Sequence, residues 1–469
     1  KNRMSEWSMS YANSMYSMEN IVNSGTAELN SRFGNKISNQ LLFTYSDIQD
    51  VRGTNSSEFP FIDIMSGDVA TGKDALNPYI SAGYELFTFN NGVKNKITTV
   101  TDNFTYYLNA HKITGGLSFE HQMADNNYMR NGTGYYRYKS ITDLINGAAP
   151  VDYALTYGTN GKLVPSNAVA FSQFGAYAQD EWNVKPNLKF TVGVRADYLV
   201  FTNDIMTNNA ILNLDFGGRH INTGEWAKAK VNLSPRIGFN WDIKNDKSIV
   251  LRGGTGLFTG RLPLVFFTNM PSNAGMNQIL QKIQTKFNTT TGGVQTRDPR
   301  LDLLAGGIIT DPAQAIAKLG LQTVVTPQDG SVPSSIAGVD RNFRMPQVWK
   351  TALAVDYKVP VSFPLSATLE ATYTKNIYAV KLDNYAVKNP DATWTTFSGS
   401  DNRYIYPSSY LYNTVKDACV LTNTSKGYGY TANVTVNAQP VKNLDVMAAY
   451  THTEMKEVSG MPGSNANSA

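Results

Sequence analysis

The stretch that decides the fold runs from Leu188 to Tyr198 and reads LKFTVGVRADY. Its even-numbered positions are all apolar, and its odd-numbered positions are all polar or Gly. Successive side chains on a β-strand point to opposite faces of the sheet. The alternation therefore predicts a strand with one apolar face and one polar face.

The same period of two recurs along the chain. It is clear in residues 232–243, 365–374 and 428–438, and weaker in residues 25–34, 39–52, 96–109, 112–125, 169–183, 248–260, 347–358 and 443–456. These segments make twelve predicted strands, most of them 10 to 15 residues long. An ordinary globular strand has about five or six residues, whereas a tilted strand that crosses a bilayer needs about 9 to 11. The strand length therefore favours a membrane protein.

Short and long connections alternate between these strands. Six are short, at residues 35–38, 110–111, 184–187, 244–247, 359–364 and 439–442, and five are long, at 53–95, 126–168, 202–230, 261–346 and 383–426. An up-and-down barrel with tight periplasmic turns and long outer loops has this order, and a β-sandwich or propeller gives no reason for it. We predict an all-β, transmembrane, antiparallel barrel whose neighbours pair in strict sequence order, without non-neighbour pairing within residues 25–456.

The composition excludes several other classes of protein. No run of apolar residues is long enough for a transmembrane helix. The net charge is only +4 in 469 residues and no Lys/Arg run stands out, so nucleic-acid binding has no electrostatic support. Cys419 is the single cysteine, which excludes an intrachain disulfide.

Two of the long loops carry signals for short helices. Residues 140–147 begin with a Ser that can cap a helix and end with Gly, and residues 311–320 begin with Asp-Pro and also end with Gly. Long loops with internal structure are usually functional.

A resemblance to a known family enters at the barrel hairpins. FGAYAQDEW at residues 174–182, with PNL at 186–188 and VGVR at 192–195, resembles the hairpin of TonB-dependent outer-membrane receptors. SPRIGF at residues 234–239 and LRGGTGLFTGR at 251–261 are similar to the Oar-like branch of this family, found in Bacteroidetes-type bacteria. Residues 28–35 and 128–136 fit the same branch.

The resemblance implies a 22-stranded barrel closed by an N-terminal plug. Residues 1–469 would then be a partial barrel domain, with the plug and the remaining strands outside this chain, and strands 25–34 and 443–456 would be unpaired on one side or forced together. A complete twelve-stranded barrel is the alternative. The implied function is active uptake of a bulky nutrient, and the implied partners are outer-membrane lipid and the TonB complex, which acts through the plug. A passive porin and an adhesin or structural barrel are the rival functions.

Seven charged residues fall on the polar faces of their predicted strands, and we expect them to line the lumen, pair with one another and contact the plug: Lys189, Arg195, Asp197, Arg236, Asp242, Arg252 and Glu370. Charge on the lipid face would cost a few kcal/mol near the midplane. The best candidates for ligand contact lie in the loops, where packing between loops is an equal alternative: Tyr128, Tyr135, Tyr136, Tyr138, Phe266 and Phe267. Tyr offers stiff amphipathic contact area for carbohydrate or peptide ligands.

No residue pattern indicates catalysis, a metal or a cofactor, so we do not expect an enzyme. The four histidines (His111, His121, His220 and His452) lack paired metal-ligand spacing, and we place His111 in a turn and His121 at a strand end, both solvated. Residues 254–260 are rich in Gly, but no helix pattern follows to receive phosphates.

The period of two also predicts which side chains face the lipid, namely Phe190, Val192, Val194, Ile237, Phe239, Leu369, Val434 and Val436. We expect Trp182, Trp241 and Tyr357 near the short-turn rim, where amphipathic rings meet lipid headgroups.

Overall fold

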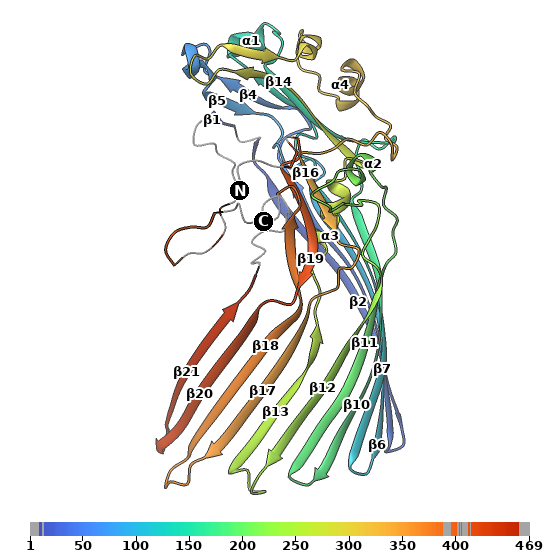
Figure 1. Cartoon of the computed structure of the whole chain (residues 1–469), viewed down its shortest axis with the longest axis vertical. Helices are drawn as coiled ribbons and strands as arrows, with labels where there is room; N and C mark the ends of the chain where they lie inside the picture. Colours follow the sequence, from blue (N-terminus) through green and yellow to red (C-terminus); the bar gives the residue numbers. More distant parts are fainter. Residues whose placement is uncertain are drawn as a thin grey trace.

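The wall of the molecule is a sheet of long antiparallel strands (Figure 1). The computed structural model describes residues 9–11, 14–387, 395–400, 403, 405, 411–412 and 414–458, so parts of the predicted 383–426 loop lie outside it. The twelve wall strands within these residues are β2 (Ser17–Phe33), β3 (Ile37–Gly53), β6 (Gly92–Leu108), β7 (His111–Asn127), β10 (Ala168–Lys185), β11 (Leu188–Phe201), β12 (Lys230–Asp242), β13 (Ile249–Thr259), β17 (Gln347–Lys358), β18 (Leu365–Asn384), β20 (Tyr428–Val441) and β21 (Leu444–Lys456).

Each wall strand pairs antiparallel with its neighbours in sequence order, which confirms the predicted topology of the wall. The six short connections all lie at the lower rim in Figure 1. Four of them contain a residue with positive φ that lets the chain reverse tightly: Gly34, Asn109, Asn245 and Asn443.

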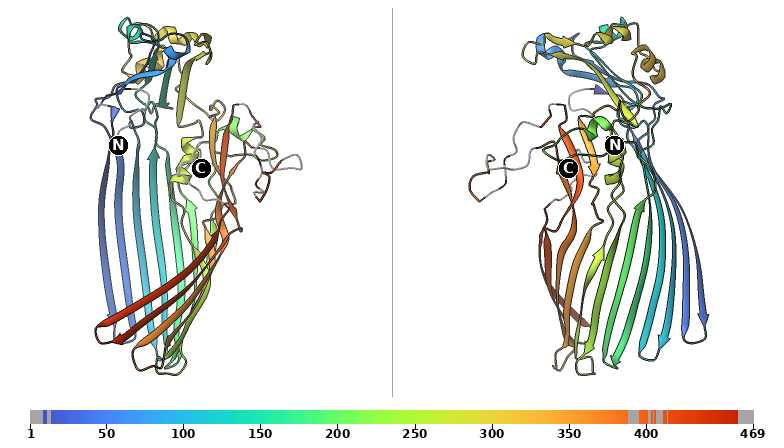
Figure 2. Two further views of the ribbon diagram at one scale, coloured as in Figure 1. Left: turned by 90° about the vertical axis from the view of Figure 1, so that its left-hand side faces the viewer. Right: turned by 45° about the vertical axis from the view of Figure 1, so that its right-hand side comes forward.

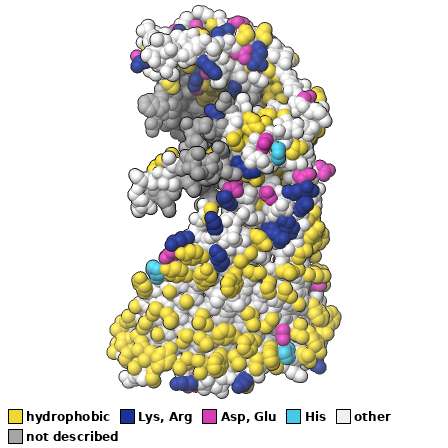
Figure 3. Space-filling view, in the orientation of Figure 1, with side chains coloured by type: hydrophobic (Ala, Val, Ile, Leu, Met, Phe, Trp, Pro, Cys, Tyr) yellow, Lys and Arg dark blue, Asp and Glu magenta, His cyan; other side chains and the backbone are white. Residues whose placement is uncertain are grey.

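The apolar face of the wall is exposed, as predicted. Val192 is 52% exposed, Leu369 is 54% exposed, and Val194, Ile237 and Val434 are similar. The other three predicted side chains, Phe190, Phe239 and Val436, are half-buried. Figure 3 shows hydrophobic side chains covering the lower part of the wall in a broad band. This exposure is the opposite of a soluble two-sheet sandwich, where these side chains would be buried.

The predicted aromatic residues also lie on this exposed face. Trp182, Trp241 and Tyr357 are 44%, 39% and 37% exposed, and each lies within a few residues of a short turn. Amphipathic rings at this depth belong to the headgroup region of a membrane. The apolar band therefore has a defined lower edge.

A second sheet, which the period of two does not predict, is formed by strands of three long loops together with a short strand that precedes β2. Seven strands lie above the wall in the order β1-β5-β4-β8-β9-β14-β15 (Figures 1 and 2). Their bounds are β1 (Met9–Ser10), β4 (Phe61–Met65), β5 (Pro78–Ala82), β8 (Tyr135–Tyr138), β9 (Asp152–Gly158), β14 (Gln278–Phe287) and β15 (Val294–Arg297).

This loop sheet corrects one prediction, because β4 pairs parallel with β8, and β9 pairs with β14 across more than a hundred residues. A further parallel pair joins β16 (Ser335–Val339) to β19 (Asp417–Thr424), which extends the upper end of β18. Strict sequence order therefore holds for the wall and is wrong for the loops. The period of two indicates a strand, but it carries no information about which distant strand is its partner.

Both predicted loop helices are present. Helix α1 (Ile141–Ile145) begins after Ser140, whose side chain accepts a hydrogen bond from the Asp143 amide. Helix α4 (Pro312–Lys318) begins after Asp311, which caps Ala313 in the same way. The other helical segments are η2 (Gly72–Leu76), α2 (Asn209–Leu212), α3 (Val265–Ser272) and η3 (Pro299–Leu304). Within the described residues, no helix has the length and apolar character to cross a membrane.

The two outermost wall strands each have one partner among the described residues. β2 pairs with β3, and β21 pairs with β20, so one side of each is unpaired, as expected for part of a larger barrel wall. The twelve strands form an open arc (Figure 2).

A pair of Arg substitutions on β18 tests the assignment of the two faces. Leu369→Arg places a cation on the lipid face, at the fifth residue of the strand. We expect it to lower the free energy of unfolding by about 1 to 3 kcal/mol, a cost between those at the membrane interface and at the midplane. The matched control Thr372→Arg lies on the polar face and should cost less than about 1 kcal/mol. The measurement is guanidinium unfolding of the full-length protein in lipid vesicles, followed by Trp fluorescence. Equal losses for the two variants would contradict the assignment.

Candidate functional site

The predicted charged residues lie on the polar face of the wall and form ion pairs there. Arg252 Nε lies 2.9 Å from Asp356 Oδ2, and Arg252 Nη2 lies 3.5 Å from Glu370 Oε2. Arg195 pairs with Asp197 at 2.7 Å. Arg195 and Asp197 neutralise each other, whereas Arg252 faces two carboxylates.

The three remaining predicted charges, Lys189, Arg236 and Asp242, have partners outside the predicted set. Lys189 Nζ lies 3.6 Å from Glu181 Oε2, and the Arg236 guanidinium lies 4.4 Å from the centre of the Phe258 ring. Asp242 accepts a hydrogen bond from the Lys247 amide in a short turn, so it also helps to close that turn.

The predicted loop aromatics divide into buried and accessible ones. Tyr136 and Phe267 are fully buried and Tyr138 is 1% exposed, so these three offer no surface to a ligand and instead hold the loops together. Phe266 is partly buried against the same cluster as Phe267. The accessible aromatics are Tyr128, which is exposed and stacks on Phe87, and Tyr135, which lines a cavity.

The histidine predictions need two corrections. His111 is the first residue of β7, where it stacks on Trp182 and its Nδ1 lies 2.7 Å from Asp180 Oδ2. The turn is shifted by one residue, from the predicted 110–111 to 109–110, and Asn109 adopts a positive φ in it. His121 lies inside β7 and hydrogen bonds with Ser172. The part of the chain that the structure describes holds no group of three metal-ligating side chains.

Cys419 is buried in β19, and this burial raises the pKa of its thiol to about 11. A thiol with so high a pKa is a poor nucleophile at neutral pH.

The loop sheet has two different faces. One face packs a hydrophobic cluster against α1, η3 and α4; its buried sheet residues are Ile62, Ile64, Tyr136, Tyr138, Tyr153, Leu155, Tyr157 and Ile283. The opposite face holds a cavity of about 550 Å³, a volume typical of small-molecule sites. The alternation of side chains along β8 explains the division, because Tyr135 and Arg137 point into the cavity while Tyr136 and Tyr138 point into the cluster.

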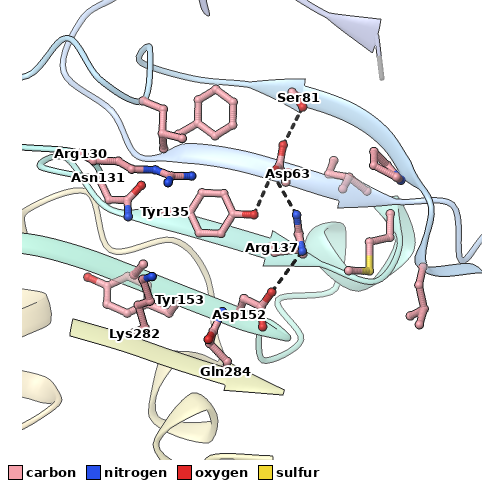
Figure 4. A pocket seen from close by; sticks show the side chains of 17 residues that line it. Asp63, Ser81, Arg130, Asn131, Tyr135, Arg137, Asp152, Tyr153, Lys282 and Gln284 are labelled. Atoms are coloured by element: carbon pink, nitrogen blue, oxygen red, sulfur yellow. Dashed lines mark hydrogen bonds and ion pairs between the residues drawn. The ribbon is translucent and has the colours of Figure 1, made fainter. Parts of the chain in front are cut away.

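A polar row crosses the cavity face from strand to strand. Register places Ser81, Asp63, Arg137, Asp152 and Gln284 next to one another on β5, β4, β8, β9 and β14. Asp63 accepts hydrogen bonds from Ser81 at 2.6 Å and from the Tyr135 hydroxyl at 2.8 Å (Figure 4). Two carboxylates share the Arg137 guanidinium, at 3.6 Å from Asp63 and 3.4 Å from Asp152.

A second row lies beside the first. Its members are Phe61, Tyr135, Ala154 and Lys282, on β4, β8, β9 and β14. Phe61 and Tyr135 stack with their ring centres 6.2 Å apart, and the small Ala154 leaves the space between Tyr135 and Lys282 open. The cavity exists because Ala stands in a row of large side chains.

Sequence reasoning found Tyr135 but missed the charged residues around it. Asp63, Arg137, Asp152 and Lys282 lie in three different loops, and only the pairing of the loop strands brings them together. One signal was available in the stretch YYRY at residues 135–138, where the period of two assigns the first Tyr and Arg to one face and the other two Tyr to the opposite face.

Burial shapes the electrostatics of the polar row. It raises the pKa of Asp152, although the Arg137 guanidinium opposes this effect. Burial and the neighbouring Asp63 carboxylate raise the pKa of the Tyr135 hydroxyl, which therefore stays a hydrogen-bond donor.

Comparison with known proteins gives a family and a fold. A family model described as an outer membrane beta barrel domain matches residues 7–468. The outer membrane transporter YddB from Escherichia coli is similar in structure, with a TM-score of 0.53 and 10% identity over 94% of this chain and 43% of that one. A mutant form of the ferric enterobactin receptor PfeA from Pseudomonas aeruginosa has a TM-score of 0.46 and 11% identity, over 93% of this chain and 43% of that one. The siderophore receptor PirA from the same organism has a TM-score of 0.44 and 9% identity, over 94% of this chain and 51% of that one.

The chain spans only about half the length of these solved structures or less, from 43% to 51%. No curated protein sequence matches it. At this level of identity the structural similarity concerns the fold.

Replacing Asp152 by Asn tests the electrostatics of the polar row. Because burial raises the pKa of Asp152, the folded loop sheet binds this proton more tightly than the unfolded chain does. The stability that comes from protonated Asp152 is therefore fully present below the ordinary pKa of about 4. It is lost as the pH rises through the raised pKa of the folded protein.

We expect the wild-type loop sheet to lose stability relative to Asp152→Asn as the pH rises above about 4, the ordinary pKa of an Asp side chain. Hydrogen exchange of the β8 and β9 amides in the two proteins, compared at each pH, measures this. A difference that does not change with pH, or that changes in the opposite direction, would contradict the role of burial.

Proposed function

Because the chain belongs to the family of outer membrane beta barrel domains, we propose that it forms part of the wall of a plugged transporter that takes up a bulky nutrient with energy from TonB. The observation that carries this proposal is the ordered sheet across the loops, which holds a polar cavity above the wall. A capture site at the mouth serves a transporter that must bind its substrate before moving it.

The ion-paired polar face supports the same proposal. In this proposal, the seven predicted charges line the lumen and contact the plug. Arg252, with its two carboxylate partners, is one of the best connected of them. A removable plug needs a seat that holds it by polar contacts exchangeable for water, and balanced charge pairs provide such contacts. Among the loop aromatics, Tyr128 and Tyr135 are the proposed ligand contacts.

The barrel lies in the outer membrane. The finer assignment to the Oar-like branch rests on the sequence motifs at residues 234–239 and 251–261. The chain is similar in structure to outer membrane transporters and receptors, and we assign it no catalytic activity. A passive porin remains the second candidate, because it would use the same kind of wall.

Conductance separates a plugged transporter from a porin without knowledge of the substrate. We expect the full-length protein in a planar bilayer to show no steady conductance, because the plug fills the barrel. Deleting the plug should open a large, stable channel. A steady conductance in the intact protein would support the porin instead.

Binding to TonB is the second measurement. The purified periplasmic domain of TonB should bind the full-length protein on a sensor surface, and deletion of the plug with its preceding segment should abolish the binding. An intact protein that is closed and yet does not bind TonB would contradict the proposal and favour an adhesin or structural barrel.

A further inference from the structure

The cavity of the loop sheet separates charge along the direction of its strands. At one end the polar row carries two carboxylates, Asp63 and Asp152, that share the guanidinium of Arg137. This end is therefore negative overall. Both contacts to Arg137 are longer than a tight ion pair, which leaves the carboxylates able to accept further hydrogen bonds.

The other end of the cavity is positive. Lys282 lies two residues before Gln284 on β14 and therefore beside the polar row. Arg130 lies in the turn before β8, where Thr156 donates its hydroxyl hydrogen to the Arg130 carbonyl. The Arg130 guanidinium lies 5.1 Å from the centre of the Phe87 ring, and among the described residues neither cation has a carboxylate within ion-pair distance. Figure 4 shows Arg130, Asn131 and Lys282 to the left of the Asp63–Arg137–Asp152 row, with Tyr135 between.

The spacing of the two ends gives the size of the matching ligand. Two residues along a strand correspond to about 7 Å. An extended dipeptide spans about the same distance, at roughly 3.3 to 3.6 Å per residue. The open space over Ala154 provides room between the two ends, and Tyr135 forms one wall of it.

We propose that this cavity binds a short peptide by its two charged termini. Its carboxylate lies between Arg130 and Lys282, and its ammonium lies against Asp63 and Asp152. A neutral sugar would find hydrogen bonds here, but it would leave both cations without a counter-charge, and for that reason we favour the peptide. The inference rests on the proposed function, since it names the substrate class that a transporter of this kind would capture.

Equilibrium binding to the full-length protein in detergent tests the proposal. The probes are Ala-Ala, its N-acetylated form, its C-terminal amide, and maltose, each measured by isothermal titration calorimetry. We expect Ala-Ala to bind and each blocked form to bind about tenfold more weakly, because each loses one charge-assisted contact.

Variants assign the two ends. Lys282→Met should reduce the effect of the C-terminal amide, because only Arg130 then faces the carboxylate, while keeping the sensitivity to N-acetylation, which also shows that the cavity is still folded. Asp152→Asn should do the reverse. Lys286→Met is the matched control, because Lys286 lies on the same face of β14 and does not line the cavity.

Three outcomes would overturn the proposal: no binding of Ala-Ala, equal binding of the free and blocked dipeptides, or maltose binding that Lys282→Met leaves unchanged. The last outcome identifies a carbohydrate site. The measurement needs neither TonB nor a membrane, so a failure here is distinct from a failure of the proposed transport.

Discussion

The structure depends on one constraint, that the hydrocarbon of a membrane offers no hydrogen-bond partner to the backbone. Antiparallel pairing in sequence order satisfies the N–H and C=O groups of each inner wall strand, from β3 to β20, from its two neighbours. The apolar face that results must turn to the lipid, as Val192 and Leu369 do, and charges such as Arg252 must turn to the other side. The long strands, the six tight turns and the division of side chains all follow from this constraint.

The wall could be read from the sequence because its determinants are local. A strand such as β11 shows its two faces in its own eleven-residue pattern, and the turns show themselves by their length. The loop sheet could not be read in this way, because β8 pairs with β4 and β9 pairs with β14 across long stretches of chain. Nothing in the residues of β8 identifies β4 as its partner.

The candidate site follows the same division. Tyr135 was predicted, because an aromatic side chain in a long loop is by itself a typical ligand contact. Asp63 and Lys282 were not, because each is an ordinary exposed charge until the pairing of distant strands places it beside Arg137 or Ala154. The chemistry of the cavity is therefore a property of the loop topology, whereas the chemistry of the wall is a property of the strand sequence.

The pairing of three different loops in one sheet has a consequence for protein engineering. Outer loops of barrels are usually treated as independent units that can be exchanged one at a time. Here β8 and β9 belong to one loop, β4 to the loop before it, and β14 to a later one. A graft of the 126–168 loop alone would carry two central strands away from both of their neighbours. The unit that can be transplanted to another barrel is thus the set of three loops together.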